Sequence, residues 1–428
     1  MHCREPITCL RIVSVVGWMM FAVSILSLLA QAASKEKVLY GFSNGADGGL
    51  PAGNLIFDKA GNLYGVTIEG GANGLGTVFK LTSANGIWTE TVLHSFGGGS
   101  DGASPKGTLI FDQAGNLYGT TYSGGSNGCI EGCGTVFELT PGAKDDWTET
   151  VLYAFTGGAD GASPEAGLVL DTTGCLYGTT YQGGDASCAT GGCGTVFKLT
   201  PGSRNRWTES VLHTFTGSDG AYPFAALTLD PADKLYGTTV SGGRYNAGVV
   251  FALAPGRGGK GKETVLHSFS GIPDGRDPSA GLARVGDTLY GTTYSGGGKL
   301  CGLATGCGTV FQLKPNARGK WIETVIHRFR GNDGIESLAT PVLDQAGNLY
   351  GTTFEGGSGP CDVCGTVIKL TPLANGHWRE TVLHNFGSGS GDGGTPEGGL
   401  IFNHLGHLFG TTAGGGRIGY GTVYEITP

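Results

Sequence analysis

Methionine, clustered basic residues and long apolar runs are all scarce in this chain. Its three methionines lie within the first 20 residues, which excludes a copper site with methionine ligands in the remainder. Charged residues make up 14% of the chain, and no block of lysine and arginine occurs. Binding to nucleic acid needs clustered positive charge, so we expect no nucleic-acid partner. No H-E-x-x-H zinc motif and no P-loop occurs either.

Glycine, by contrast, is abundant, with 83 residues placed at regular positions. The stretch "LYGTTYSGG" occurs twice without change, at Leu117–Gly125 and Leu289–Gly297. Looser copies recur every 54 to 60 residues, and seven aromatic residues mark them: Tyr64, Tyr118, Tyr177, Tyr236, Tyr290, Tyr350 and Phe409. A period sustained over seven copies is typical of a repeat architecture.

Each copy contains four apolar segments in constant order, such as "GNLIFD", "LYGTT", "GTVFKLT" and "WTETVLHSF". Each segment is five to nine residues long, rich in β-branched and aromatic residues, and bounded by turn residues, so we expect four strands per copy and almost no helix. The last copy lacks a fourth segment, whereas an extra one, Val38–Phe42, precedes the first. The sequence therefore predicts an all-β, seven-bladed β-propeller over residues 33–428, with four antiparallel strands per blade. Its ring closes when Val38–Phe42 completes the last blade.

The first 32 residues have the features of an export signal. Arg4 and Arg11 precede the uncharged run Ile12–Leu29, and "AQA" follows at Ala30–Ala32. This order predicts a cleaved signal peptide over residues 1–32, with an uncleaved membrane anchor as the alternative. We expect no membrane span after cleavage, and a secreted or periplasmic location.

Cysteine usage agrees with export. Eight cysteines form close pairs before the "GTV" segment of four copies, at separations of three to six residues. Metal sites need a steadier spacing, so we predict four disulfides: Cys129–Cys133, Cys188–Cys193, Cys301–Cys307 and Cys361–Cys364. Cys175 replaces an asparagine of the repeat, and we interpret it as a buried or half-buried free thiol.

Two sets of polar residues recur once per blade. An aspartate precedes glycine in all seven turns between copies, at Asp47, Asp101, Asp160, Asp219, Asp274, Asp333 and Asp392. We interpret these residues mainly as turn formers, and a ring of carboxylates that binds a cation such as Ca²⁺ is the alternative. Five histidines occupy one position of the outermost segment, where we expect packing or hydrogen-bonding roles at the rim. We expect no catalytic, metal or cofactor site from these sets.

Ligand contacts are expected on the face that carries the cysteine loops, because binding residues concentrate on variable loops. Four aromatic residues end the second strand there, and four further residues interrupt the repeat nearby. The candidate contacts are Tyr122, Tyr181, Tyr294, Phe354, Arg244, Tyr245, Arg276 and Arg417.

The pattern "DxxGNLYGTTxxGGxxxxGTVFKLTPxxxxWTETVLHSFxGGxDGxxP" resembles the Gloeo/Verruco (GloVer) tandem repeat of choice-of-anchor bacterial proteins. The resemblance covers Val38 to Pro428 and implies an exported β-propeller, but no particular activity. We therefore expect a non-catalytic exported protein that binds an extracellular or envelope partner, glycan or protein, on the face with the cysteine loops. The alternatives are a secreted carbohydrate-active hydrolase or lyase with its site at the channel mouth, and a structural envelope protein. The sequence leaves open the ligand and the oligomeric state.

Overall fold

The fold is a ring of β-sheets. The computed structural model describes residues 34–428 except 144–145, 186, 189–190, 255, 257–259, 300–301, 360 and 362. The predicted signal peptide, residues 1–32, lies outside the described residues. Within them there is no α-helix, and hence no helix long and apolar enough to cross a membrane. Single 3₁₀ turns at Gly99–Asp101 and Ser203–Asn205 interrupt the loops.

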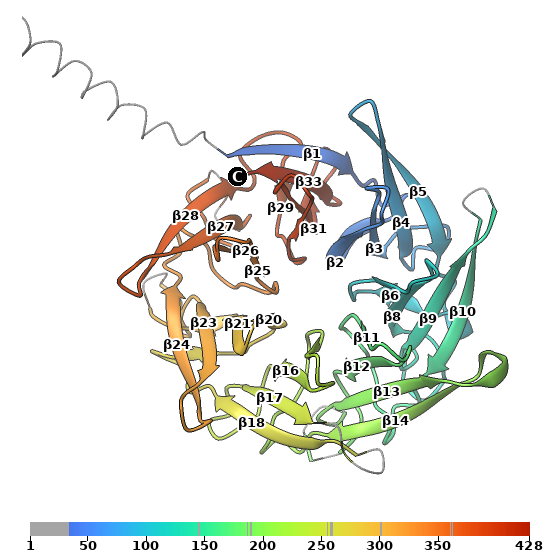
Figure 1. The fold of residues 1–428 in the computed structure, drawn as a ribbon. Coiled ribbons are helices and arrows are strands. Elements are labelled where there is room, and N and C mark those ends of the chain that lie inside the picture. Colours follow the sequence, from blue (N-terminus) through green and yellow to red (C-terminus); the bar gives the residue numbers. More distant parts are fainter. Residues whose placement is uncertain are drawn as a thin grey trace, which may run out of the picture.

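Seven antiparallel sheets, each with four principal strands, surround a central axis (Figure 1). Blade 1 contains β2 (Gly49–Phe57), β3 (Leu63–Glu69), β4 (Thr77–Ala84) and β5 (Ile87–Ser95). Blade 2 contains β6 (Ala103–Pro105), β7 (Ile110–Phe111), β8 (Leu117–Ser123), β9 (Thr135–Pro141) and β10 (Trp147–Ala154). Blade 3 contains β11 (Val169–Leu170), β12 (Leu176–Thr180), β13 (Thr195–Pro201) and β14 (Trp207–Thr214). Blade 4 contains β15 (Thr228–Leu229), β16 (Leu235–Thr239), β17 (Val249–Ala254) and β18 (Lys262–Ser268). Blade 5 contains β20 (Ala283–Val285), β21 (Thr288–Thr293), β23 (Thr309–Pro315) and β24 (Trp321–Arg328). Blade 6 contains β25 (Val342–Leu343), β26 (Leu349–Thr353), β27 (Thr366–Pro372) and β28 (Trp378–Asn385). Blade 7 contains β30 (Ile401–Phe402), β31 (Leu408–Thr412), β33 (Thr422–Thr427) and β1 (Lys35–Gly41).

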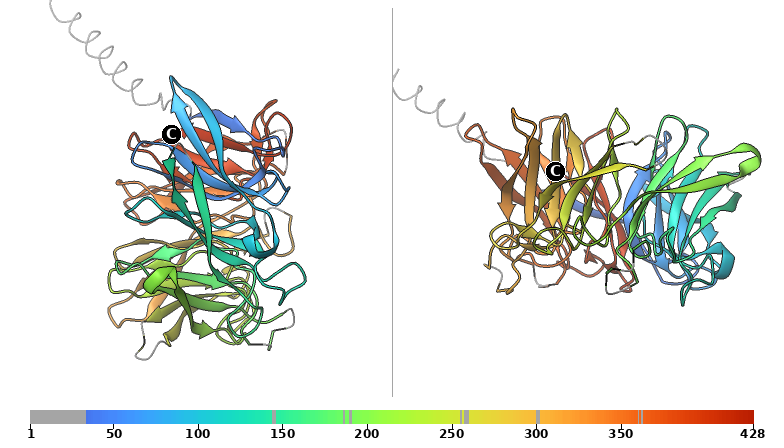
Figure 2. Two further views of the ribbon diagram at one scale, coloured as in Figure 1. Left: turned by 90° about the vertical axis from the view of Figure 1, so that its right-hand side faces the viewer. Right: turned by 90° about the horizontal axis from the view of Figure 1, so that it is seen from below.

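The blade strands run between two faces that carry the loops (Figure 2). Two short pairs of strands lie outside the seven sheets. The pairs join β19 (Gly275–Arg276) to β22 (Ser295–Gly296), and β29 (Gly393–Gly394) to β32 (Gly414–Gly415).

The predicted closure of the ring is confirmed. Strand β1 pairs antiparallel with β33, from Lys35 opposite Thr427 to Gly41 opposite Thr422. The two ends of the described chain therefore lie side by side in blade 7 (Figure 1). Directly after β1, the buried ring of Phe42 packs against Phe79 of blade 1, with 5.1 Å between centroids. Closure thus joins the last blade to the first through both hydrogen bonds and core contacts.

The innermost strands are shorter than the sequence predicts. Five of them, β7, β11, β15, β25 and β30, contain two residues each, although the apolar segments suggested at least five. In these five strands only the end of the apolar segment pairs with strand two, whereas β2 pairs over Gly49–Phe57 with a register shift between Ala52 and Ile56.

Each blade core is built from a glycine and an aromatic ring in facing strands. In blade 3, a Cβ atom placed on Gly178 of β12 would lie 2.5 Å from the ring of Phe197 on β13. Equivalent contacts involve Gly65, Gly119, Gly237 and Gly291 with Phe79, Phe137, Phe251 and Phe311. Blade 6 differs because Ile368 replaces the phenylalanine, and a Cβ on Gly351 would meet nothing within 4 Å.

This difference yields a matched pair of substitutions. We expect Gly178→Ala to lower the free energy of unfolding by roughly 1–3 kcal/mol, because the new methyl group overlaps the Phe197 ring. Gly351→Ala should be neutral, or stabilising by about 0.4–1 kcal/mol, because the unfolded chain loses freedom while no atom is displaced. Denaturant unfolding of both variants measures the two effects, and equal destabilisation would contradict this packing account.

Aromatic residues and threonines connect neighbouring blades. Trp147, Trp207, Trp321, Trp378 and Trp88 lie edge-on, with centroids 6.2–6.4 Å away, against the rings of Tyr64, Tyr118, Tyr236, Tyr290 and Phe409 in the preceding blade. The first threonine of "GTT" reaches the next inner strand, as where Thr120 donates to the carbonyl of Ala166 at 2.9 Å. The second threonine forms a hydrogen bond to the third strand of its own blade; the hydroxyl groups of Thr121 and Thr135, for example, lie 2.8 Å apart. Most seams therefore combine ring contacts outside with hydrogen bonds near the axis.

Candidate functional site

A strained turn leads into the inner strand of every blade. At one equivalent position φ lies between 51° and 60° although no residue there is glycine, as in Leu50, Ser104, Ser163, Tyr222, Asp277, Glu336 and Thr395. This left-handed conformation is rare for bulky or β-branched side chains and costs about 1–3 kcal/mol each. Six of these residues precede a proline, which keeps the following backbone extended. Strain repeated seven times around one axis marks this ring of turns as a functional candidate.

The cysteine loops hold these turns in place. Three of the predicted disulfides are present, Cys129–Cys133, Cys188–Cys193 and Cys361–Cys364, whereas the fourth includes Cys301, which lies outside the described residues. The carbonyl of the second cysteine accepts the amide N–H of the strained residue in the next blade: Ser163 to Cys133 at 2.8 Å, Tyr222 to Cys193 at 2.9 Å, Glu336 to Cys307 at 3.2 Å and Thr395 to Cys364 at 2.9 Å. In the three loops without cysteine, the carbonyl groups of Leu75, Ala247 and Tyr420 accept the equivalent amide N–H of the next blade. Cys175 is a buried free thiol, as predicted.

Removing one disulfide should loosen one turn of the site. In the double variant C129A/C133A we expect hydrogen exchange over residues 161–165 to become roughly tenfold faster, because the loop that supplies the Cys133 carbonyl is no longer closed. Residues 102–106 are the internal control, since their Ser104 amide bonds to Leu75 in a loop that has no cysteine. Equal acceleration of both segments, measured by mass spectrometry, would contradict a local role for the disulfide.

The second residue after each strained position lines a channel of about 410 Å³ that runs between the blades. One side chain from each blade lines it: Ala52, Lys106, Glu165, Phe224, Ser279, Leu338 and Glu397. Beside them, small residues such as Gly53, Gly107 and Ala166 let the inner strands approach closely. A Cβ on Gly107 would lie 2.6 Å from the backbone of Ala166. The backbone of the ring is thus uniform, while the side chains of this ring differ from blade to blade.

The charged members of this ring interact. Lys106 Nζ lies 3.0 Å from Glu165 Oε2, and the Glu165 side chain is 8% exposed. Burial raises the pKa of Glu165 although Lys106 opposes the shift. Burial also raises the pKa of Glu397, with Lys106 opposing and Glu165 reinforcing that shift. Two carboxyl groups therefore share the field of one ammonium group inside the channel.

Half-buried aromatic rings stand beside these charges on blades 2 to 4. The Lys106 ammonium lies 4.0 Å from the centroid of the Tyr122 ring, a cation–π geometry. Tyr181 packs against Tyr222 at 5.1 Å and against the channel-lining Phe224 at 6.2 Å. Burial and the nearby Glu165 raise the pKa of Tyr181. These contacts form an aromatic wall, which we define as Tyr122, Tyr181, Tyr222 and Phe224.

A second group of charges lies on blades 5 and 6. Burial and a hydrogen bond to Glu336 raise the pKa of Tyr294, and Glu355 and Asp277 contribute to the same shift. Burial and Glu336 raise the pKa of Glu355. Asp277 accepts a hydrogen bond from the Ser295 hydroxyl at 2.8 Å and pairs with Arg276 at 3.1 Å. The strained turns therefore bring carboxylates together here as well.

The remaining candidate contacts are spread over the same face. Phe354 is half-buried, and its amide donates to the Glu336 carbonyl, so it stands behind the strained turn of blade 6. Arg244 and Tyr245 are exposed and stack on each other at 5.2 Å outside the channel lining. Arg417 borders a separate hollow of about 640 Å³ between blades 6 and 7. The structure thus joins Tyr122 and Tyr181 to the channel, whereas Arg244, Tyr245 and Arg417 stay predictions at other places.

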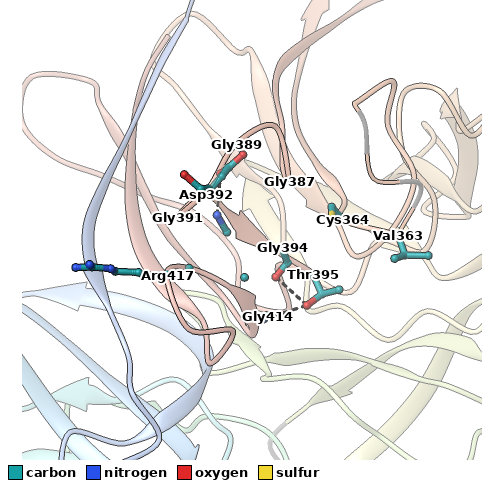
Figure 3. Close-up of a pocket in the computed structure, with 14 residues that line it drawn as sticks. Val363, Cys364, Gly387, Gly389, Gly391, Asp392, Gly394, Thr395, Gly414 and Arg417 are labelled. Atoms are coloured by element: carbon teal, nitrogen blue, oxygen red, sulfur yellow. Dashed lines mark hydrogen bonds between the residues drawn. The ribbon is translucent and has the colours of Figure 1, made fainter.

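The hollow beside Arg417 offers little free chemistry (Figure 3). Its lining is mostly glycine, together with Cys364, Asp392 and Thr395. The Thr395 hydroxyl donates to the Gly394 carbonyl and accepts the Gly414 amide, and Asp392 is bonded to His384. Figure 3 shows Arg417 extended away from these groups. Because its polar side chains are occupied by the fold, this hollow is a weaker candidate than the channel.

The seven repeated aspartates lie in separate seams. Each accepts a hydrogen bond from the outer strand of its neighbouring blade. The donors are histidines in five seams, His94, His213, His267, His327 and His384, and tyrosines in the other two, Tyr40 and Tyr153. The rim role predicted for these histidines is confirmed. Backbone amides bond the same carboxylates, as from Ser43 to Asp47, which agrees with their interpretation as turn formers.

A glutamate of the next blade completes each seam. One buried carboxylate oxygen finds no hydrogen-bond partner among the described residues in each of Glu36, Glu90, Glu149, Glu209, Glu263, Glu323 and Glu380. Burial raises the pKa of Glu209 and Glu263 to about 7, with contributions from the neighbouring aspartates. In three seams the histidine, aspartate and glutamate atoms lie within 4.8 Å of one another. Imidazole in that donor set suits a transition metal better than Ca²⁺.

These seams predict a pH dependence of stability. The raised pKa of Glu209 and Glu263 means that their contribution is complete below the ordinary value of 4.5 and is lost as the pH rises through about 7. Hydrogen bonds from histidine outweigh burial and hold the pKa of Asp219 and Asp274 below its usual 3.8, so that contribution is lost only as the pH falls below this value. We therefore expect a melting temperature higher at about pH 5 than at about pH 8. The variant E209Q/E263Q should reduce this difference, while the glutamates of the other five seams keep part of it. A melting temperature that rises toward alkaline pH would contradict the assignment.

Sequence reasoning missed the charged members of the channel ring. Lys106, Glu165 and Glu397 occupy one position directly after the repeated proline, and Phe224 occupies it in blade 4. The sequence did carry a signal: the residue between the repeated proline and the small residue that follows differs from copy to copy. Such variation indicates a side chain that the blade does not need for its own packing.

The closed ring of seven four-stranded blades defines the protein as a seven-bladed β-propeller. The Gloeobacter/Verrucomicrobia repeat matches residues 25–190, 185–316 and 300–428. The chain belongs to the Gloeobacter/Verrucomicrobia repeat family, as its sequence pattern implied.

Several solved structures are similar to this chain at low sequence identity. A candidate 6-phosphogluconolactonase from Bacteroides uniformis is 15% identical, with a TM-score of 0.49 over 76% of this chain and 83% of its own. A Dyadobacter fermentans protein of unknown function is 14% identical, with a TM-score of 0.42 over 82% and 98% of the two chains. A luciferin-regenerating enzyme is 11% identical, with a TM-score of 0.44 over 92% and 95%. No curated protein matches the sequence.

Proposed function

We propose that this protein is an exported, non-catalytic binding protein that holds an extracellular glycan at the channel mouth on the face with the cysteine loops. The observation that carries the proposal is the meeting of half-buried aromatic rings with carboxyl groups at the mouth of one channel. Sugars present C–H faces that pack on aromatic rings and hydroxyl groups that bond to carboxylates. The aromatic wall beside Glu165 and Glu397 offers both kinds of contact.

The dimensions of the site favour a small chain over a folded partner. A volume of about 410 Å³ falls within the range of small-molecule pockets. A stable interface with a protein buries about 800 Å² on each partner, mostly on flatter surfaces. A glycan end or a single extended chain therefore fits the channel better than a protein surface does.

The charge arrangement favours binding over hydrolysis. Glycoside hydrolysis uses two carboxyl groups whose surroundings separate their pKa values. Here the pKa values of Glu165 and Glu397 shift in the same direction, and Glu165 is bound to Lys106. A hydrolase or lyase is therefore the second candidate, and a structural envelope protein the third.

Export is supported by the three disulfides, which form in oxidising compartments. The signal peptide expected over residues 1–32 agrees with this, and we therefore propose a secreted or periplasmic location for the mature protein.

A glycan array combined with an assay for released reducing ends tests the proposal. The array should carry neutral, amino and uronic oligosaccharides, and each bound sugar is then incubated with the protein. Binding without release is the expected result. Release of reducing ends would favour the hydrolase or lyase, and absence of binding to every glycan would favour the structural protein.

Removing one ring of the aromatic wall should weaken binding of the best array ligand. We expect Tyr181→Ala to raise the dissociation constant roughly tenfold, because the stacking surface beside Phe224 is lost. Ile130→Ala is the control, since Ile130 is fully exposed on the cysteine loop of blade 2, outside the channel lining. Isothermal titration measures both variants, and equal affinities for them would place the ligand elsewhere.

A further inference from the structure

The channel mouth carries more negative than positive charge. Two carboxyl groups, Glu165 and Glu397, and one ammonium group, Lys106, line the channel, whereas Asp277, Glu336 and Glu355 form the second group on blades 5 and 6. Lys106 is paired with Glu165 at 3.0 Å, and in the second group Arg276 is paired with Asp277 at 3.1 Å. No ion pair among the described residues involves Glu397, which shares the field of Lys106 with Glu165, so the channel keeps one surplus carboxylate. An electronegative cleft attracts cationic ligands over neutral or anionic ones.

The mouth already binds one primary ammonium group, which belongs to the protein itself. Lys106 Nζ lies 3.0 Å from the carboxylate of Glu165 and 4.0 Å from the centroid of the Tyr122 ring. A carboxylate on one side and an aromatic face on the other is the arrangement that recognises ammonium ligands. The side chain of Lys106 therefore shows which chemistry this part of the channel accepts.

Glu397 provides a second position for an ammonium group in the same channel. Its carboxyl group lies in the field of Lys106 and Glu165, and no hydrogen bond to it is present among the described residues. The groups that face it from neighbouring blades carry one positive and one negative charge, so they do not compensate a third charge. A ligand ammonium beside Glu397 would neutralise this carboxylate, and the nearby aromatic wall would receive the ring that carries the amine.

We infer that the glycan held at this mouth is an oligosaccharide of amino sugars whose amino groups are free and protonated. This inference rests on the proposed glycan site and names its ligand class. A free amine neutralises the surplus carboxylate of Glu397, whereas N-acetylated sugars bring no charge to it. Sugar rings in turn use the aromatic wall, which an aliphatic polyamine fills poorly.

The test compares two ligands that differ only in acetylation. Chitotetraose and tetra-N-acetylchitotetraose are titrated into the wild-type protein by calorimetry at about pH 6 and about 0.15 M salt, with spermine as a third probe. We expect chitotetraose to bind about tenfold more tightly than the acetylated form. At about pH 9, where most of the amino groups are neutral, this preference should disappear.

Two charge-neutralising variants locate the effect. In Glu397→Gln the preference for chitotetraose should fall to about parity, while affinity for the acetylated form is retained. Asp287→Asn removes the same charge from a side chain that is 87% exposed on the hairpin between β20 and β21, and it should keep the preference. The wild-type pH series tests the same point independently should the Glu397 variant fold poorly.

The outcomes separate the two proposals. Equal or tighter binding of the acetylated tetramer overturns the amino-sugar inference and leaves the glycan site standing. Binding of spermine as tight as that of chitotetraose also overturns the inference, because charge alone would then suffice. If neither tetramer binds, the glycan site and the inference drawn from it both fall.

Discussion

The antiparallel pairing of β1 with β33 is the constraint on which the rest of the structure depends. It places residues from the two ends of the described chain in one sheet and brings blade 7 against blade 1. Contacts at this junction repeat those of the other seams: Leu50 donates to the Tyr420 carbonyl, and Gly399 donates to the side chain of Asn54. A closed ring has no free sheet edge, and it aims seven equivalent turns at one axis. An open array of the same blades would have neither a channel nor a mouth.

The repeated letters "LYGTT" each serve this ring. In blade 2, Leu117 is buried in the core and the Tyr118 hydroxyl bonds to Asp112 in the preceding hairpin. Gly119 leaves space for the Phe137 ring. Thr120 reaches the next blade, and Thr121 reaches strand three of its own. Every letter has a partner in all or most blades, which explains why the stretch recurs almost unchanged.

Much of the fold could be predicted because the repeat is visible in the letters. The period indicated seven blades, and the unequal ends of the chain indicated closure between Val38–Phe42 and the last strand. The length of the inner strands could not be predicted, because similar apolar segments form the nine-residue strand β2 and five strands of two residues each. The channel ring could not be predicted either. Lys106, Glu165 and Glu397 are distant in sequence and meet only when blades 2, 3 and 7 share one axis.

The sequence therefore contains two kinds of position, those that build the scaffold and those that form the site. Positions that keep the repeat build the blades and seams, whereas positions that depart from it at the mouth supply the chemistry. The disulfides connect the two groups, since the second cysteine of each bonded loop holds the strained turn of the following blade. This division means that the mouth tolerates exchange of its side chains while the ring beneath it stays the same.

The central claim is that ring closure gathers one variable side chain from each blade into a ligand site at the channel mouth. A crystal structure of the protein soaked with an oligosaccharide that it binds tests this claim most directly. The account predicts sugar density in the channel, against Phe224 and within hydrogen-bonding distance of Glu397. Density confined to the outer rim, or to the hollow beside Arg417, with an empty channel, would contradict it.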